Sequence, residues 1–332
     1  MGNTNFDVLG IGNAIVDVIA RCDDAFLEQN AMSKGHMQLI LAAEAERLYS
    51  AMGPAVEVSG GSAANTCAGV ASFGGNVAFI GRVAQDQLGR IFSHDIRSIG
   101  VDFDTDPAID GAPTARSLIL VTPDGERTMN TFLGASVELG EAELDRAKIE
   151  GARLTYLEGY LFDPPLAQAA FHEAARIAAQ AGRQVALSLS DAFCVDRHRA
   201  AFRSLIQGGV DLLFANEHEI CALYEVEDFD EAAQAVRGEC KLAALTRSAK
   251  GSLIVTPEEQ IEIQAAPVEK VVDVTGAGDL YAAGFLYGRA VGCDLKTCGK
   301  LASLAAAEVI GHLGARPETS LGELARAQGL VN

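Results

Sequence analysis

The fold follows from nine residues, Val271-Val272-Asp273-Val274-Thr275-Gly276-Ala277-Gly278-Asp279, and from what surrounds them. β-branched residues run here into a Gly-Ala-Gly turn, and the residues from Leu280 onward have a helical pattern. The first N–H groups of a helix lack partners and carry the positive end of its dipole, so small residues there let an anion approach. The stretch predicts an anion hole at Gly276, Ala277 and Gly278, with a phosphate as the expected anion.

A carboxylate, Asp279, stands beside this predicted anion hole. A carboxylate next to bound phosphate is unfavourable for binding alone but suits catalysis, because it accepts the proton of an attacking hydroxyl while the amides stabilise the transferring phosphoryl group. We therefore predict that Asp279 is a general base. The alternative is that Asp279 only caps the helix, which is a common role of aspartate.

Upstream of this stretch, strand-like and helix-like segments alternate regularly. Such alternation predicts a doubly wound, mostly parallel α/β sheet with helices on both faces. The predicted strands are 6–11, 15–20, 77–81, 154–158, 184–189, 212–215 and 242–246, with an edge hairpin at 252–255 and 260–263. The predicted helices are 60–75, 87–99, 165–181, 199–207, 217–224, 230–239, 279–290 and 295–310.

Residues 101–135 interrupt the alternation. Segments 115–122 and 127–133 flank the turn Pro123-Asp124-Gly125-Glu126, which is a hairpin signal. We see no linker, internal repeat or low-complexity tract. The hairpin is therefore predicted to be a small β appendage within one domain that spans residues 1–332.

Two glycine-rich segments lie near the N-terminus. Gly60-Gly61-Ser62-Ala63-Ala64-Asn65 opens a predicted helix, and its glycines indicate either a ligand site or close packing of a helix on a sheet. Gly10-Ile11-Gly12-Asn13-Ala14-Ile15 resembles a dinucleotide-binding turn, but that turn must open a helix, and residues 15–19 are strand-like. An oxidoreductase that binds NAD is therefore disfavoured. Asp17 lies on this strand, either to hold two vicinal sugar hydroxyls or as an exposed strand residue.

A fourth feature, Asn216-Glu217-His218-Glu219, follows the strand at 212–215. Asn216 and Glu219 share a helix face at the carboxyl edge of the predicted sheet, where ligands bind in such folds. Together they could order Mg²⁺ through its waters. The alternative is a capping box, in which the same two residues close the helix N-terminus.

Composition excludes several classes of function. The 332 residues carry a formal net charge of −19, which opposes binding to nucleic acid or to an anionic membrane. The seven cysteines are scattered, and no segment has the length of a membrane helix, so we expect a cytoplasmic protein without a membrane partner. The sequence lacks a P-loop, so a P-loop NTPase is excluded.

Taken together, the segments at 60–75, 216–219 and 273–279 resemble the signatures of the ribokinase (PfkB) family of sugar and nucleoside kinases, in order and spacing. Val274 stands where the family usually has threonine. The resemblance implies a ribokinase-like fold with a small β lid, built from segments at about 13–45 and 101–135, that closes over substrate. It also implies ATP as the phosphoryl donor and Mg²⁺ as a cofactor, and it suggests K⁺ as a further cofactor near the anion hole. A small-molecule nucleoside or sugar is the expected partner, bound by a monomer or a homodimer.

The resemblance assigns roles residue by residue. Asp279 is the base, and Gly276, Ala277 and Gly278 form the anion hole. The acceptor residues are Asn13, Asp17, Gln38, Gly60, Gly61 and Asn65. The nucleotide residues are Asn216, Thr246, Gly251 and Ser303, the last standing where the family often has asparagine near the adenine. Asn216 and Glu219 organise Mg²⁺ and phosphate. Arg127 is a candidate for phosphate contact and Tyr160 for stacking on a base, although Tyr160 also suits a core position.

Within the family, Gly12-Asn13-Ala14-Ile15-Val16-Asp17 and Gln38-Leu39-Ile40 resemble adenosine kinases, whereas residues 60–65 are nearer to bacterial sugar kinases. We therefore expect an ATP-dependent kinase for a primary hydroxyl of a ribose-containing substrate, with adenosine, converted to AMP, as the first candidate. The alternative is a kinase for a free sugar such as ribose, fructose or a keto-deoxy sugar acid. A catalytically idle sensor on the same scaffold should lack the base or the glycines, and both are present.

Overall fold

The computed structural model describes residues 5–331 and contains two sheets. The larger sheet has nine strands in the order β14-β13-β12-β11-β10-β9-β1-β5-β6. All neighbours from β12 to β6 are parallel, and β13 and β14 are antiparallel. These strands are Phe6–Ile11 (β1), Val77–Ile80 (β5), Val101–Asp102 (β6), Ala152–Glu158 (β9), Gln184–Ser188 (β10), Leu212–Asn216 (β11), Ala243–Thr246 (β12), Ser252–Val255 (β13) and Gln260–Ile263 (β14).

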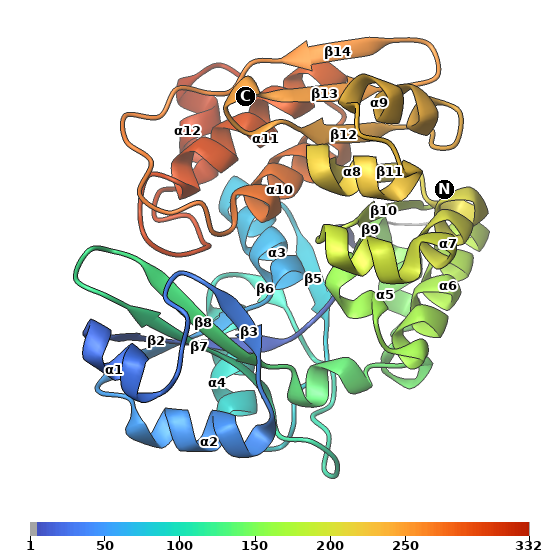
Figure 1. The fold of residues 1–332 in the computed structure, drawn as a ribbon. Helices are drawn as coiled ribbons and strands as arrows, with labels where there is room; N and C mark the ends of the chain where they lie inside the picture. Colours follow the sequence, from blue (N-terminus) through green and yellow to red (C-terminus); the bar gives the residue numbers. More distant parts are fainter. Residues whose placement is uncertain (1–4, 332) are drawn as a thin grey trace.

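Helices cover both faces of this sheet (Figure 1). On β1, Val8 packs in a core with α3, α10 and α11, whereas its neighbour Leu9 packs in a second core with α6 to α9. The helices are Asp24–Gln29 (α1), Ala42–Ala51 (α2), Ser62–Phe73 (α3), Gln87–Ser98 (α4), Arg146–Gly151 (α5), Pro165–Gln180 (α6), Ala192–Gly209 (α7), Glu217–Tyr224 (α8), Phe229–Arg237 (α9), Ala277–Ala290 (α10), Leu295–Val309 (α11) and Leu321–Ala327 (α12). The doubly wound prediction is confirmed.

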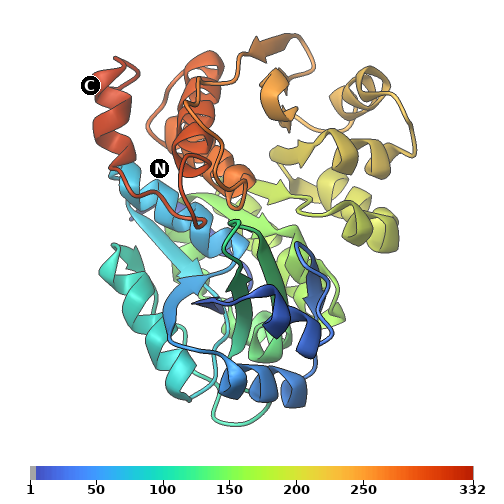
Figure 2. The same cartoon turned by 60° about the vertical axis from the view of Figure 1, so that its left-hand side comes forward.

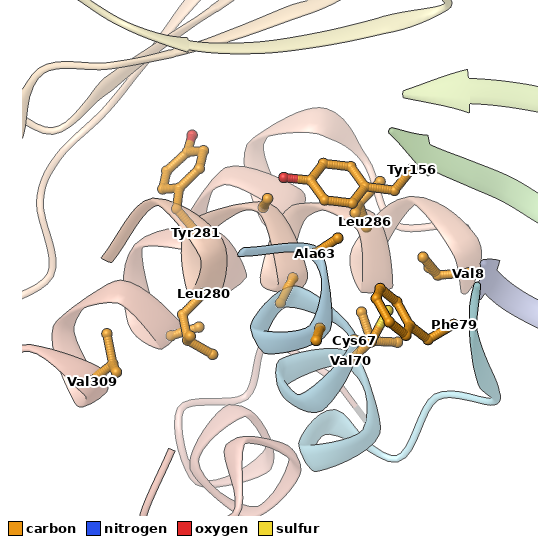
Figure 3. Packing of buried hydrophobic residues seen from close by; sticks show 14 of the residues in the cluster. Val8, Ala63, Cys67, Val70, Phe79, Tyr156, Leu280, Tyr281, Leu286 and Val309 are labelled. Carbon is orange, nitrogen blue, oxygen red and sulfur yellow. The ribbon is translucent and has the colours of Figure 1, made fainter. Parts of the chain in front are cut away.

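Helices α3 and α10 lie side by side, and small residues allow the close approach (Figure 3). A Cβ on Gly69 of α3 would meet the Cβ of Ala283 on α10 at 2.5 Å, and one on Gly10 of β1 would meet Sγ of Cys67 at 2.5 Å. Close packing therefore explains Gly69 and Gly10, whereas added Cβ atoms on Gly60 and Gly61, the glycines of the predicted segment, would meet Asp17 and Asn13 instead. This packing brings the first turns of α3 and α10 together.

The smaller sheet has five strands in the order β3-β8-β7-β2-β4. They are Ile15–Arg21 (β2), Met37–Leu39 (β3), Ala55–Gly60 (β4), Ala115–Val121 (β7) and Arg127–Phe132 (β8). Helices α2 and α4 pack against it. In Figures 1 and 2 this sheet (blue and green) lies below the C-terminal helices (orange and red).

The differences from prediction concentrate in the first 60 residues. Strand β4 lies outside the segments 13–45 and 101–135 from which we expected the small sheet to be built, and α1, α2 and β3 were not predicted.

Helix α7 begins at Ala192 rather than at 199, and the chain kinks within it at His198, with φ of −124°. Strand β2 begins at Ile15, as predicted, so the turn at Gly10 opens no helix and does not form a dinucleotide site. No helix within residues 5–331 has the length and apolar character needed to cross a membrane.

Candidate active site

A cavity of about 760 Å³ lies between the carboxyl ends of the large sheet and the inner face of the small one. Strand ends β9, β10, β11 and β12 contribute Glu158, Ser188, Asn216 and Thr246. Ligands bind at this edge of doubly wound sheets. Of the residues predicted from the sequence, the cavity is lined by Asn13, Asp17, Gly61, Asn65, Asn216, Glu219, Thr246, Gly276, Ala277, Gly278, Asp279 and Tyr160.

Asp279 is the third residue of α10, and it does not cap the helix. The N-cap is Gly276, whereas the carboxylate of Asp279 accepts hydrogen bonds from Ser62 Oγ at 2.6 Å and from Asn65 Nδ2 at 3.1 Å. Burial raises the pKa of this carboxyl, and the two hydrogen bonds oppose the rise. Asp279 is therefore a half-buried carboxylate that faces the cavity with acceptor capacity to spare.

The predicted anion hole, Gly276-Ala277-Gly278, contains two glycines that differ in their surroundings. Gly276 has φ of +79°, and a Cβ there would meet Cα of Ala315 at 2.7 Å, so the turn itself requires glycine. A Cβ on Gly278 would meet no atom within 4 Å. Packing therefore does not explain glycine at position 278. Open space beside free helix N–H groups suits an approaching anion.

Asp17 projects from β2 into the cavity, and glycines make room for it. A Cβ on Gly60 would lie 2.4 Å from Oδ2 of Asp17, and Gly61, with φ of +100°, would place a Cβ 2.2 Å from the carbonyl oxygen of Asn13. Burial raises the pKa of Asp17 to about 6, against the attraction of Arg316 and Arg127 and with repulsion from Asp279. Within residues 5–331 no donor hydrogen-bonds this carboxylate.

A buried carboxylate that the sequence analysis missed, Glu158, holds the turn after β1. It accepts hydrogen bonds from the Asn13 side chain at 2.6 Å and from the Ala63 N–H, in the first turn of α3, at 2.7 Å. Burial raises its pKa to about 7, against these hydrogen bonds. Oδ1 of Asn13 is buried without a partner in the described part of the chain. The place of Glu158 at the carboxyl end of the buried strand β9 was the signal that could have identified it.

Asn216 and Glu219 form the capping box that was the alternative prediction. Oδ1 of Asn216 accepts from the Glu219 N–H at 2.9 Å, and Glu219 accepts from the Asn216 N–H at 3.0 Å and from Nδ2 at 2.6 Å. Burial raises the pKa of Glu219 to about 7, opposed by the Asn216 N–H and reinforced by Asp191. A nearby cation would favour the charged form of Glu219 and so oppose the effect of burial. Mg²⁺ is commonly held by one or two carboxylates, waters and phosphates, which this pair fits.

No group of three or more side chains suited to holding a metal ion occurs between residues 5 and 331. A metal at this site would therefore depend on substrate phosphates and water for most of its ligands.

Five of the predicted residues lie outside the cavity lining: Gln38, Gly60, Gly251, Ser303 and Arg127, the last of which is described below. Gln38 donates to Oδ1 of Asn130 at 2.6 Å, and its neighbours Met37 and Leu39 line the cavity instead. Ser303 accepts from the Ala266 N–H at 2.7 Å, and a Cβ on Gly251 would collide with the carbonyl oxygen of Ile263. These two residues fix the backbone around 263–266. Gly60 acts by leaving space for Asp17.

Arg127, a candidate for phosphate contact, forms an ion pair with Asp273. Both side chains are about nine-tenths buried, with exposed fractions of 10% and 7%. Asp273 also accepts from Thr275 and from the Gly314 N–H, and these hydrogen bonds together with Arg127 outweigh burial and lower its pKa. The pair ties strand β8 of the small sheet to the loop that leads into the anion hole.

An apolar wall that the sequence analysis missed faces the cavity from the small sheet. Side chains on alternate positions of four neighbouring strands point the same way, as strand geometry requires. Tyr160 and Phe193, which are 44% and 74% exposed, line the same cavity. The small-sheet part of the wall consists of Ile15, Met37, Leu39, Ile119 and Met129.

The chain is similar to known kinases. An adenosine kinase structure from Sinorhizobium meliloti is 57% identical, with a TM-score of 0.90, and covers 98% of this chain and 100% of that one. The structure of a probable sugar kinase from Rhizobium etli CFN 42 is 53% identical, with a TM-score of 0.91, and covers 99% and 100%. An ATP-dependent ribose-1-phosphate kinase from Halopiger xanaduensis is 29% identical over 300 residues, which are 86% of this chain and 93% of the relative.

The family model of the pfkB carbohydrate kinases matches residues 29–320. That match includes the glycine-rich start of α3, the Asn216–Glu219 pair and the anion-hole turn. By this match, and by the site it encloses, the chain belongs to the pfkB family of carbohydrate kinases and is a sugar or nucleoside kinase that uses ATP.

Proposed function

We propose that this kinase phosphorylates the primary hydroxyl of a ribose-containing nucleoside, with adenosine, converted to AMP, as its substrate. The observation that carries the proposal is the pairing of an unsatisfied carboxylate, Asp17, with an apolar wall in one cavity. A nucleoside presents the matching pair of groups, a vicinal diol and a flat, weakly polar base.

Asp17 supports the ribose part of the proposed nucleoside substrate. A carboxylate has acceptor sites for several hydrogens, and two adjacent hydroxyls of a sugar donate to its two oxygens. Asp17 faces the cavity without a hydrogen-bond donor from the part of the protein that the structure describes. The two hydroxyls of a diol would replace the hydrogen bonds from water that the carboxylate loses on burial. The unpartnered Oδ1 of Asn13 can accept a further hydrogen from the ligand.

The apolar wall supports the nucleobase part of the proposed substrate. Met37 and Leu39 on β3 are 54% and 60% exposed, and both line the cavity. A free sugar carries hydroxyls on nearly every carbon, and each would need a polar partner when buried. Side chains of this kind, with Phe193 and Tyr160 in the same cavity, suit the faces of an aromatic base.

The transfer chemistry follows from Asp279 and the turn before it. Asp279 takes the proton of the acceptor's primary hydroxyl, whose oxygen attacks the γ-phosphoryl group of ATP. The N–H groups at the start of α10 stabilise the charge on that group. Asn216 and Glu219 would hold Mg²⁺ through water, and the ion would neutralise phosphate charge when bound.

The alternative, a kinase for a free sugar, is supported by different relatives. The Rhizobium etli structure is called a probable sugar kinase. The Halopiger xanaduensis relative is called a ribose-1-phosphate kinase, and the substrate in that name is a sugar phosphate rather than a free sugar. The Sinorhizobium meliloti adenosine kinase, at 57% identity, supports adenosine.

A screen of phosphoryl acceptors with the pure protein, ATP and Mg²⁺ tests the proposal. We expect the highest kcat/KM on adenosine, low turnover on other nucleosides, and little on ribose, fructose, ribose 1-phosphate or a keto-deoxy sugar acid. Higher kcat/KM on any free sugar than on adenosine rejects it. The same assay in Na⁺ and in K⁺ buffers tests the expected monovalent cation, and sedimentation distinguishes monomer from homodimer.

A further inference from the structure

Arg316 lies in the segment 310–320 between α11 and α12, and none of the roles described so far uses it. Its Nε donates to Oδ1 of Asn65 at 3.3 Å, and its Nη1 donates to Oδ2 of Asp95 at 3.2 Å. Asp95, on α4, also accepts from the N–H and the hydroxyl of Ser59 on β4. Arg316 is therefore held by an anchored carboxylate on one side and by an active-site amide on the other.

The contact with Asn65 fixes which way that amide points. Arg316 has only donors, so it must face the carbonyl oxygen of Asn65, and Nδ2 is then directed at Oδ2 of Asp279. With the amide reversed, its oxygen would face the carboxylate of Asp279, and two acceptors would repel each other. The series Asp95–Arg316–Asn65–Asp279 thus determines the hydrogen bond that the proposed base receives.

The same guanidinium acts on the acceptor carboxylate. Asp17 is surrounded by three charged groups that affect its ionisation, since Arg316 and Arg127 attract its negative charge and Asp279 repels it. Burial raises the pKa of Asp17 to about 6 despite the two arginines. Arg127 is paired with Asp273 and Arg316 with Asp95, and Nη2 of Arg316 is buried without a partner in the described part of the chain. Loss of Arg316 therefore removes charge compensation from Asp17.

We propose that Arg316 is a positioning residue for phosphoryl transfer, which orients Asp279 through Asn65. This inference rests on the proposed function in so far as Asp279 is the base and Asp17 binds the acceptor. It adds a residue from the C-terminal segment to a site otherwise built from β2, α3 and α10.

The test measures steady-state kinetics of Arg316→Gln and Arg316→Lys against pH, on whichever acceptor the wild type phosphorylates best. For Arg316→Gln we expect kcat about ten-fold to a hundred-fold lower and an acid limb of kcat/KM moved up by about one pH unit. Arg316→Lys keeps the positive charge but cannot donate to Asn65 and Asp95 with the geometry of a guanidinium. The acid limb of kcat/KM should therefore return to its wild-type position, while kcat stays low.

A double-mutant cycle with Asn65→Ala tests whether the effect passes through Asn65. In the Asn65→Ala background, Arg316→Gln should lower kcat by less than about three-fold, because the amide to be oriented is already absent. Arg97→Gln is the matched control, since Arg97 donates to the carbonyl oxygen of Phe103 away from the cavity. Its melting temperature should fall while its pH profile stays that of the wild type.

Two outcomes overturn the inference: an Arg316→Gln enzyme with wild-type kcat and pH profile, or full additivity with Asn65→Ala. Failure of the proposed function is visible separately. If Asp279→Asn keeps wild-type turnover, the base assignment fails, and if a free sugar is preferred, the acceptor assignment fails.

Discussion

Ser62 donates its hydroxyl hydrogen to Oδ1 of Asp279 at 2.6 Å, although the two residues are 217 positions apart in the chain. The bond joins the first turn of α3 to the first turn of α10, at the point where the two helices pack together. It holds the carboxylate beside the turn that we propose as the anion hole. Positioning of this kind is worth much of a catalytic rate, because the reacting groups need not be ordered during the reaction.

Replacing the proposed base tests its role directly. Asp279→Asn keeps the size of the side chain and an oxygen that can accept from Ser62, but it cannot take a proton. We expect kcat to fall by about 10²- to 10⁴-fold, with ATP and acceptor affinities changed only slightly. Rapid-quench kinetics and calorimetric titration measure the two quantities. A variant that turns over at the wild-type rate would show that Asp279 is not the base.

Gly278 provides a test of the anion hole that separates function from folding. A Cβ there meets no protein atom, and alanine favours helices, so Gly278→Ala should fold with unchanged or slightly higher stability. The added methyl group occupies space that we assign to phosphate, so kcat/KM for ATP should fall by about ten-fold or more.

Gly208→Ala is the matched control for Gly278→Ala. Gly208 is also helical and also has no atom within 4 Å of an added Cβ, but it lies at the far end of α7. It should gain stability by about 0.5–1 kcal/mol and keep full activity. If both alanine variants retain full activity, phosphate does not approach Gly278.

Acidic pH should weaken binding of the acceptor. The pKa of Asp17 is raised to about 6 by burial, so the carboxyl gains a proton as pH falls through about 6 and then no longer accepts two hydroxyl hydrogens. Acceptor kcat/KM should therefore decrease below about pH 6 in the wild type. Asp17→Asn should lose this limb and bind the acceptor weakly at every pH. An acid limb that is unchanged in Asp17→Asn would assign it to another group.

A pair of alanine substitutions compares backbone strain with steric collision. Gly61 and Gly74 both have positive φ, at +100° and +92°, but only at Gly61 would a Cβ collide, with the carbonyl oxygen of Asn13. Gly74→Ala should cost about 1 kcal/mol of stability and keep activity. Gly61→Ala should cost more, and because it displaces Asn13 it should also raise KM for the acceptor. Equal urea midpoints and equal KM values for the two variants would contradict this account.

Much of the fold could be predicted because its strands and helices have strong local patterns. The strands at 252–255 and 260–263 match the structure at both ends, and helices 217–224 and 230–239 lie within two residues of α8 and α9. The first 60 residues were harder. Strand β4 begins with two exposed residues and helix α2 lacks a side-chain cap, so neither gives a clear start signal.

Within the site, Gln38 shows where sequence reasoning stops. Its segment resembles one of adenosine kinases, which made Gln38 a candidate acceptor residue, but which neighbour faces the cavity depends on the register of β3. Gln38 pairs with Asn130 on β8, so Met37 and Leu39 turn to the cavity. A shift of one residue would reverse all three side chains, and no local pattern distinguishes the two registers.

The alternating α/β architecture, the turn at Gly276-Ala277-Gly278 and the order of the glycine-rich and acidic motifs follow from local properties of the chain, namely its periodicity, turn chemistry and helix starts. The tertiary structure alone decided that Ser62 and Asn65 meet Asp279, that Glu158 holds Asn13, and that Arg316 reaches Asn65 from 251 residues away. The contacts of Asp279 and Arg316 arise where α3 packs against α10 and where the C-terminal segment folds back over both, and the contact of Glu158 with Asn13 arises where the end of β9 meets the turn after β1. Such long-range packing depends on the shapes of whole surfaces, which no short stretch of sequence encodes.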